Sequence, residues 1–426
     1  MPEKSSSPAR GPRPHRLPPP PPPLPDLNFL AQIGSVLGLT LWKAFRDVKT
    51  WSETEPEKRR RYFRPLTDVV RERFAYAKHE APELEGPLAT FSLLVQAPEA
   101  IEAEQIAAAC EAVYKWAEER GMMLTALYFA EAAAYVQPDD PASANQAART
   151  ARRNLMRDRA AMWHYRAYKL AVRLKDNRKR TRETIWALIG YGAMMRDAGN
   201  YKEARRFTQR AATRAVGARR QKEAGMAFHD LFVIAVELQR FTLALKHARS
   251  AFNYYPVRHP SIPRLAHDLA FMLIRLRHFP AVLTILTKAI PLMLQPVERA
   301  IAWSSLAWAA GGAGLRDRFR ETERVTLELL PSHPDFAPAM FIHLAEGARA
   351  LREWDRARGY ALAAKESAVQ TQSPTLEEEA AALVGYIERR EPAPAQAEST
   401  SEIESLTALV LSRLDRWKAP GEQPGA

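Results

Sequence analysis

Residues 107–140 read AAACEAVYKWAEERGMMLTALYFAEAAAYVQPDD, and they predict two helices joined by a tight turn. Gly121 separates two stretches whose apolar residues recur at three- and four-residue spacing, the period of an amphipathic helix. Glycine accepts the backbone angles of such a turn. Ala126 and Ala133 lie on one face of the second stretch, where small side chains let two helices approach closely. Pro138 then ends the second helix, because proline cannot continue one.

The same offsets recur through the chain as far as residue 371. A turn residue is followed five positions later by a first anchor and twelve positions later by a second anchor, and most anchors are alanine. The turn residues are Gly121, Leu155, Gly199, Gln239, Arg277, Gly314 and Arg352. The first anchors are Ala126, Ala160, Ala204, Ala244, Val282, Phe319 and Ala357. In four units an aromatic residue follows the turn by two positions, and we expect it to fill its own hairpin: Tyr201, Phe241, Phe279 and Trp354.

These residues and spacings resemble the tetratricopeptide repeat family, whose unit is a helical hairpin of 34 residues. The first anchors at 126 and 160 are 34 residues apart and later ones are 37 to 44 apart, so the array is divergent. No stretch of this region predicts a strand. The resemblance implies an all-α, right-handed α-solenoid of about seven antiparallel hairpins over residues 107–371. It also implies that the first helix of each hairpin lines a concave side that holds peptides.

The N-terminal residues differ from this array. Residues 1–25 are rich in proline and contain LPPPPPPLP, which favours a disordered, solvated tail with polyproline II character. A ligand for a proline-binding groove is the alternative. Residues 26–106 predict further helices, with Asp26 as the first cap. The apolar stretch within residues 27–48 is too short to span a bilayer, so a packed or interfacial helix is favoured over a membrane attachment.

The C-terminal residues predict two more helices. Residues 372–391 are expected to form a capping helix, and residues 392–400 a flexible linker. Residues 401–418 predict an amphipathic helix, with Ser401 and Glu404 in a capping-box pattern. Its apolar face would carry Ile403, Leu406, Leu409, Val410, Leu414 and Trp417. Such a helix needs a surface to pack on, and it would either cap the array or fold back along its groove.

Composition limits the function. The 426 residues carry a formal charge of +13 and one cysteine, Cys110, which excludes an intramolecular disulfide framework and a cysteine-rich zinc site. A single thiol fits a reducing compartment, so we expect a cytoplasmic protein. The sequence contains no phosphate loop, dinucleotide fingerprint, H-E-x-x-H or G-x-S-x-G motif. We therefore expect a scaffold or adaptor for protein partners, neither an enzyme nor a binder of cofactors or metals.

The charge is concentrated in residues 149–222, which hold 22 Lys and Arg against five acids, a net +17. Its densest part is RLKDNRKRTR, residues 173–182. One interpretation is a binding surface for an acidic protein or peptide or, as the alternative function, for nucleic acid. The other is a solvated helix face. The aromatic residues Trp163, His164, Tyr165 and Tyr168 lie in the same segment, and we expect them to be packing residues rather than a base-stacking surface.

Candidate partner-binding residues follow from the expected first-helix faces: Asn145, Gln146, Arg149, Arg152, Arg153, His229, Arg264, His267 and Trp308. The family's known clamp for a peptide carboxylate uses Lys, Asn and Arg on three consecutive first helices. Here those faces carry Glu111 with Lys115, and Trp186 with Ile189, so that specificity is not expected. We expect His267 and Asp268, as sequence neighbours, to point to different faces, and the segment GGAG at 311–314 to be a turn.

Overall fold

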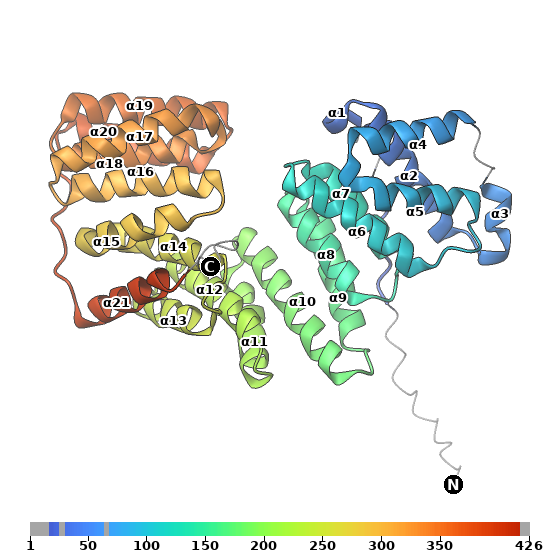
Figure 1. The fold of residues 1–426 in the computed structure, drawn as a ribbon. Coiled ribbons are helices and arrows are strands. Elements are labelled where there is room, and N and C mark those ends of the chain that lie inside the picture. Colours follow the sequence, from blue (N-terminus) through green and yellow to red (C-terminus); the bar gives the residue numbers. More distant parts are fainter. Residues whose placement is uncertain (1–16, 25–29, 64–67, 418–426) are drawn as a thin grey trace, which may run out of the picture. The chain divides into compact units, whose positions relative to one another are not determined.

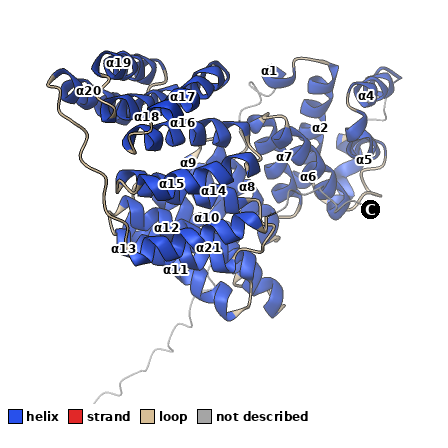
Figure 2. Ribbon diagram, turned by 60° about the vertical axis from the view of Figure 1, so that its left-hand side comes forward, coloured by secondary structure: helices blue, strands red, loops and turns tan. Residues whose placement is uncertain are grey.

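The computed structural model describes residues 17–24, 30–63 and 68–417, and every regular element in these ranges is helical (Figure 1, Figure 2). The chain forms two compact units, residues 1–214 and residues 215–426. Within each unit, helices pack against their neighbours in chain order. The predicted all-α architecture of stacked helical hairpins is therefore confirmed.

The first unit begins with short helices and continues as hairpins. Its helices are α1 (Leu30–Ile33), α2 (Val36–Glu53), α3 (Arg59–Tyr62), α4 (Asp68–Glu80), α5 (Glu85–Gln96), α6 (Ala103–Glu119), α7 (Met123–Val136), α8 (Pro141–Arg153), α9 (Arg157–Ala171) and α10 (Asn177–Asp197). Helix α11 (Tyr201–Gly217) crosses the boundary at residue 214. Helices α6 and α7 pair, as do α8 and α9, and α10 lies against both α8 and α9.

The second unit repeats the hairpin four times. Its helices are α12 (Gln221–Glu237), α13 (Phe241–Tyr254), α14 (Ser261–Arg275), α15 (Phe279–Ala289), α16 (Pro296–Gly312), α17 (Arg316–Leu329), α18 (Ala337–Ala350), α19 (Trp354–Gln370), α20 (Pro374–Glu388) and α21 (Ser401–Asp415). The first helices α12, α14, α16 and α18 contact one another in that order. They form one row, which positions the side chains considered below.

All seven predicted turn residues adopt the left-handed backbone conformation, with φ between 55° and 75°. In each hairpin the N–H of the next residue donates to the carbonyl five residues earlier, as Met122 does to Ala117 at 2.9 Å. This bond is the signature of a Schellman helix end, which uses a left-handed residue. The seven first anchors are all 0% exposed. Turn and anchor therefore fix the hairpin together, even where the turn residue is Leu, Gln or Arg.

Two contacts show how closely the hairpins of the second unit approach. One joins two glycines, and the other joins a glycine and an aromatic ring. A Cβ atom on Gly311 would lie 2.3 Å from the carbonyl oxygen of Gly347, so α16 and α18 touch through their backbones. The segment at 311–314 is thus only partly the predicted turn, because Gly311 and Gly312 belong to α16 and Gly314 alone has a positive φ. The ring of Phe279 also lies against Gly312 of the next hairpin, a contact that the sequence did not predict.

Helix α2 is the centre of the N-terminal core. Its buried residues include Leu41, Phe45 and Trp51, and it contacts α4, α5 and α7. The helix begins after Ser35, whose side chain accepts a hydrogen bond from the Gly38 N–H. The expected cap, Asp26, lies outside the described residues. The apolar stretch is therefore a packed helix, and none of the helices in the described ranges combines the length and apolar character needed to cross a bilayer.

The C-terminal helix α21 packs on α13, α14 and α15, and so lies mainly on second helices of the second unit. It buries the predicted apolar face, including Ile403, Val410 and Trp417. The predicted capping box was wrong, because the Thr400 side chain caps the helix by accepting from the Ile403 N–H. The preceding linker was expected to be flexible, yet it is bonded to the turn residue Arg277 at two points, Ala395 and Ala397.

The proline-rich residues 17–24 also differ from expectation. They lie on the first unit, where their carbonyl groups accept hydrogen bonds from Tyr135, Arg159 and Arg166. The prediction of a disordered, solvated tail was therefore wrong for this part. Residues 1–16 and 25 of the predicted tail lie outside the described residues.

Candidate binding surface

Five of the predicted binding residues lie on α8, and the structure surrounds their charges with groups of the same chain. Arg152 forms an ion pair with Asp197 of α10 at 2.7 Å. Arg153 forms one with Glu118 of α6. The two arginines therefore bridge α8 to both flanking first helices, and an acidic partner would have to compete with these carboxylates.

The other three α8 residues are partly buried and bonded to neighbours. Arg149 donates to the Gln146 side chain and, at 3.4 Å, to the Tyr114 hydroxyl. The Asn145 side-chain amide donates to the Glu183 carbonyl at 3.4 Å. The structure thus brings the five predicted residues together on one helix. Each contacts a group of the same chain, while Asn145 Oδ1 and Arg149 Nε have no hydrogen-bond partner among the described residues.

An exposed basic stripe runs along α11, and none of its residues is among the predicted binding residues. Lys202, Arg206, Arg210 and Arg214 are spaced by four residues, which places them on one helix face, and all four are exposed. Among the residues that the structure describes, only Arg206 of these four has an acidic neighbour within ion-pair distance, Glu203 at 3.1 Å. The signal was present in the sequence as the four-residue spacing inside the basic segment.

The densest basic segment forms the start of α10. Asp176 caps the helix by accepting from the N–H groups of Arg178 at 2.7 Å and Lys179 at 3.1 Å. These backbone hydrogen bonds hold the pKa of the Asp176 carboxyl below its usual value. Lys175 and Arg180 are exposed beside it. The segment therefore presents positive charge at a helix N-terminus with one acid already engaged by the backbone.

The aromatic residues of α9 follow the packing interpretation in part. Trp163 and His164 are buried, at 0% and 2% exposure, whereas Tyr165 is 47% exposed. The imidazole of His164 fills the space that a side chain at residue 190 would need, because a Cβ on Gly190 would lie 2.0 Å from the ring. These two side chains are core residues and do not form a stacking surface.

In the second unit, three side chains on adjacent first helices form one polar track. His229 Nε2 of α12 lies 2.8 Å from Asp268 Oδ2 of α14, and His267 Nδ1 lies 3.5 Å from the other oxygen of that carboxylate. The expectation that His267 and Asp268 point to different faces was wrong, since the carboxylate lies between the two rings. Burial opposes ionisation of Asp268, but the hydrogen bonds from the two histidines prevail and lower the pKa of its carboxyl.

The track continues onto α16 and α18. His267 Nε2 lies 3.4 Å from the Ser305 hydroxyl, and Ser304 lies 2.8 Å from His343 Nδ1. The predicted residue Trp308 packs on His343, with ring centroids 5.3 Å apart. Three predicted residues, His229, His267 and Trp308, therefore belong to one surface formed by the first-helix row. Arg264, the fourth predicted residue of this unit, is exposed on α14 with Glu298 at 3.6 Å.

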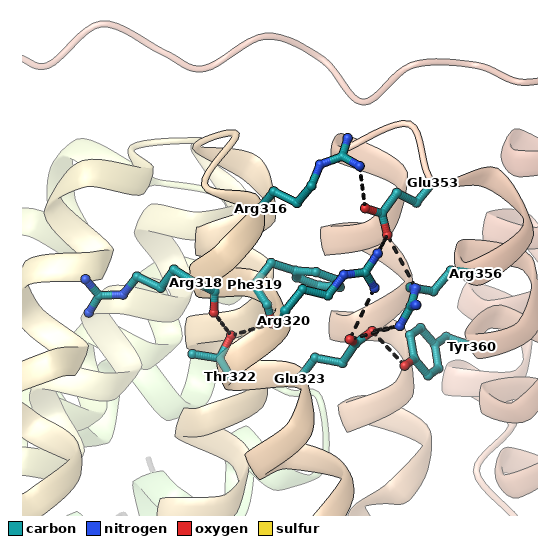
Figure 3. A network of polar contacts seen from close by, with 9 residues as sticks. All are labelled: Arg316, Arg318, Phe319, Arg320, Thr322, Glu323, Glu353, Arg356 and Tyr360. Carbon is teal, nitrogen blue, oxygen red and sulfur yellow. Dashed lines mark hydrogen bonds and ion pairs between the residues drawn. The ribbon is translucent and has the colours of Figure 1, made fainter.

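A separate ionic network links the second helices α17 and α19 (Figure 3). The Glu323 carboxylate, 5% exposed, accepts from Arg356 at 2.8 Å and from the Tyr360 hydroxyl at 2.7 Å. Arg320 joins Glu323 to Glu353, at 3.3 and 2.6 Å. Burial, and then the bond to Glu323, raises the pKa of Tyr360 to about 12. Because every group is paired across two successive hairpins, this network stabilises the stack.

Two buried histidines are expected to make the protein sensitive to acid. Burial lowers the pKa of His164 to about 3 and that of His343 to about 3. Between pH 6.5 and 3 the unfolded chain therefore binds more protons than the folded chain, so stability falls as the pH falls through this window. Each histidine contributes roughly 1.4 kcal/mol per pH unit.

Denaturant unfolding of H343Q and the unaltered protein, measured from pH 7 to 4.5, tests this. We expect the free energy of unfolding of H343Q to fall less steeply below pH 6.5, by roughly 1.4 kcal/mol per pH unit. Equal slopes would mean that His343 is not buried in its neutral form.

Comparison with known proteins adds no family to these observations. A scan of the chain against protein-family models gives no match, and a search of curated proteins gives none either.

Proposed function

We propose that this chain is a non-enzymatic adaptor of the tetratricopeptide-like type that binds an acidic segment of a protein partner. The stacked hairpins support the proposal because helices that pack in chain order present regular surfaces. We further propose that it works in the cytoplasm, a location consistent with its single cysteine, Cys110, being a fully buried thiol.

The observation that carries the proposal is the basic stripe on α11. Like charges four residues apart destabilise a helix by roughly 0.2–0.5 kcal/mol per pair, so the stripe costs stability in the isolated chain. Arg152 and Arg153 of α8, by contrast, are paired with Asp197 and Glu118. An acidic segment lying along α11 would offset the repulsion among Lys202, Arg206, Arg210 and Arg214. The stripe therefore supports an acidic partner better than the α8 residues do.

The polar track of the second unit supplies a second kind of contact. His229 and His267 are partly buried and flank the Asp268 carboxylate, and Trp308 adds an aromatic surface along the same row. Side chains of this kind can exchange hydrogen bonds with a peptide backbone while an apolar ring covers its side chains. We propose that this track contributes to specificity, and the basic stripe to affinity.

Exchange of two stripe residues tests the proposal without loss of the helix. The double variant K202E/R210E makes acids and bases alternate along α11, which favours helix formation. We expect its affinity for a fluorescein-labelled Glu-rich peptide, measured by anisotropy at about 50 mM salt, to fall by roughly tenfold, or about 1.4 kcal/mol.

The matched control is K246E/K365E, which changes the net charge equally through exposed lysines of α13 and α19. Its affinity for the peptide should stay within about twofold of the original. Equal losses in both variants would show that net charge alone attracts the peptide, and the stripe would then have no special role.

Nucleic acid is the alternative ligand, favoured by the exposed basic residues at the start of α10. Binding of arbitrary duplex DNA or RNA through four phosphate contacts would weaken by roughly 100-fold between 50 and 200 mM salt. If such binding is also tighter than binding of the Glu-rich peptide and is lost in K202E/R210E, the alternative replaces the adaptor proposal.

A further inference from the structure

The proline-rich residues 17–24 have a burial pattern with a period of three. Pro18 and Leu24 are partly buried and Pro21 is buried, while Pro19, Pro20, Pro22 and Pro23 are exposed; Leu17, which precedes this pattern, is also partly buried. A polyproline II helix has three residues per turn, so every third residue faces the same side. From Pro18 to Leu24 the burial pattern therefore matches a polyproline II helix with one face against the first unit.

Three side chains of α7 and α9 hold this segment by its carbonyl groups. The Tyr135 hydroxyl donates to the Pro21 carbonyl at 3.1 Å. Arg159 donates to the Pro22 carbonyl at 2.7 Å, and Arg166 donates to the Pro18 carbonyl. Because proline has no N–H group, the six prolines offer only carbonyl oxygens as backbone hydrogen-bonding groups. Tyr135, Arg159 and Arg166 all donate hydrogen bonds, so they suit a segment whose prolines can only accept them.

Two of the donors, Arg159 and Arg166, also form hydrogen bonds with other groups of the first unit. Glu131, 2% exposed, accepts from two nitrogens of Arg159 and, at 2.8 Å, from the indole N–H of Trp163. Burial raises the pKa of the Glu131 carboxyl, and the bonds from Arg159 and Trp163 favour its ionised form. Arg166 donates a second hydrogen bond, to the Pro138 carbonyl at 2.7 Å. The geometry of the site is therefore held independently of the segment that occupies it.

Apolar contacts hold both ends of the segment. Leu17, Tyr135 and Tyr168 pack against one buried cluster that contains Trp163, and the rings of Tyr135 and Trp163 are 5.6 Å apart. Leu24 packs on Leu127, Ala151 and Ala160. Aromatic surfaces with hydrogen-bond donors are how proteins recognise preformed polyproline II segments. The site therefore contacts both leucines that flank the run of six prolines, Leu17 and Leu24.

We propose that α7 and α9 form a binding site for a polyproline II peptide, that residues 17–24 occupy it from within the chain, and that a proline-rich segment of a partner takes their place. The contacts use backbone carbonyls and apolar ends, so they do not depend on this segment being part of the same chain. Only residues 25–29 separate the segment from α1, and a short tether gives a high local concentration, on the order of millimolar. A partner's segment must therefore bind tightly enough, or be concentrated enough, to displace the internal segment. This proposal is independent of the acidic-segment adaptor.

The test compares the full-length protein with the variant L17S/P21S/L24S, which weakens the internal segment and leaves the site intact. The probe is a fluorescein-labelled peptide of sequence LPPPPPPLP, and the measurement is fluorescence anisotropy. We expect the variant to bind the probe at least about fivefold more tightly than the original protein, because the internal competitor is lost. The milder variant P21S should show a smaller rise in the same direction.

Y135F in the L17S/P21S/L24S background should weaken probe binding by about threefold to tenfold, the value of one hydrogen bond. Y165F, which alters an exposed tyrosine of α9, should leave it unchanged. Circular dichroism confirms that each variant is folded. Folded variants that do not bind the probe would overturn the proposal and leave the segment a purely structural strap. An original protein that is dimeric and becomes monomeric in L17S/P21S/L24S would overturn the assignment of the segment to its own chain.

Discussion

Gly311→Ala is expected to lower the free energy of unfolding of the second unit by about 3 kcal/mol. The new Cβ atom would lie 2.3 Å from the carbonyl oxygen of Gly347 and 2.6 Å from its Cα atom. Backbone atoms of a packed helix cannot rotate away as a flexible side chain can, so α16 and α18 would have to separate. Urea unfolding followed by circular dichroism measures the loss as a lower midpoint.

Gly359→Ala is the matched control for this change. Gly359 lies inside α19, and a Cβ atom built on it meets nothing within 4 Å. Alanine favours a helix over glycine, so this variant should be more stable by roughly 0.5–1 kcal/mol. If Gly311→Ala stabilised the protein as Gly359→Ala is expected to do, the close approach of α16 and α18 would be refuted.

Glu323→Ala is expected to destabilise the same unit by about 3 kcal/mol. Arg356, Arg320 and Tyr360 would lose the carboxylate that pairs them, and the space it leaves is buried (Figure 3). This loss in the free energy of unfolding lies at the lower end of the range for a broken buried ion pair. The reason is that Arg320 and Arg356 are both more than a third exposed, so water can solvate them.

Glu328→Ala tests whether this loss reflects burial or merely the loss of an acid from α17. Glu328 pairs with Arg324 at 2.8 Å, and both side chains are at least 60% exposed. Such a surface pair contributes roughly 0.2–1 kcal/mol. A similar loss in the two variants would mean that the network around Glu323 is no more important to the stack than an ordinary surface ion pair.

The hairpins could be predicted because their determinants are local. A turn residue and an alanine five positions later both act within one hairpin, and the same bond from Met122 to Ala117 recurs in each of the seven. The approach of Gly311 to Gly347 could not be predicted, because it depends on which faces of two hairpins meet. Sequence spacing alone assigned Gly311 to the turn.

The candidate site was predicted less well, for a related reason. Spacing placed Arg152 and Arg153 on a first-helix face, but it could not show that Asp197 and Glu118 of other helices would pair with them. In the same way, sequence adjacency separated His267 from Asp268, while the fold puts His229 of another helix against that carboxylate. Pairing between distant residues is a tertiary property.

The hairpin register, on which the whole account depends, is tested most directly by placing glycine at three turn positions. Leu155, Gln239 and Arg352 hold φ between 55° and 61°, and the side chain of Leu155 is 82% exposed. A side chain in this backbone region costs roughly 1 kcal/mol that glycine avoids. L155G, Q239G and R352G should therefore each raise the free energy of unfolding by about 1 kcal/mol. A loss of about 1 kcal/mol in each, as glycine causes inside a helix, would contradict the account.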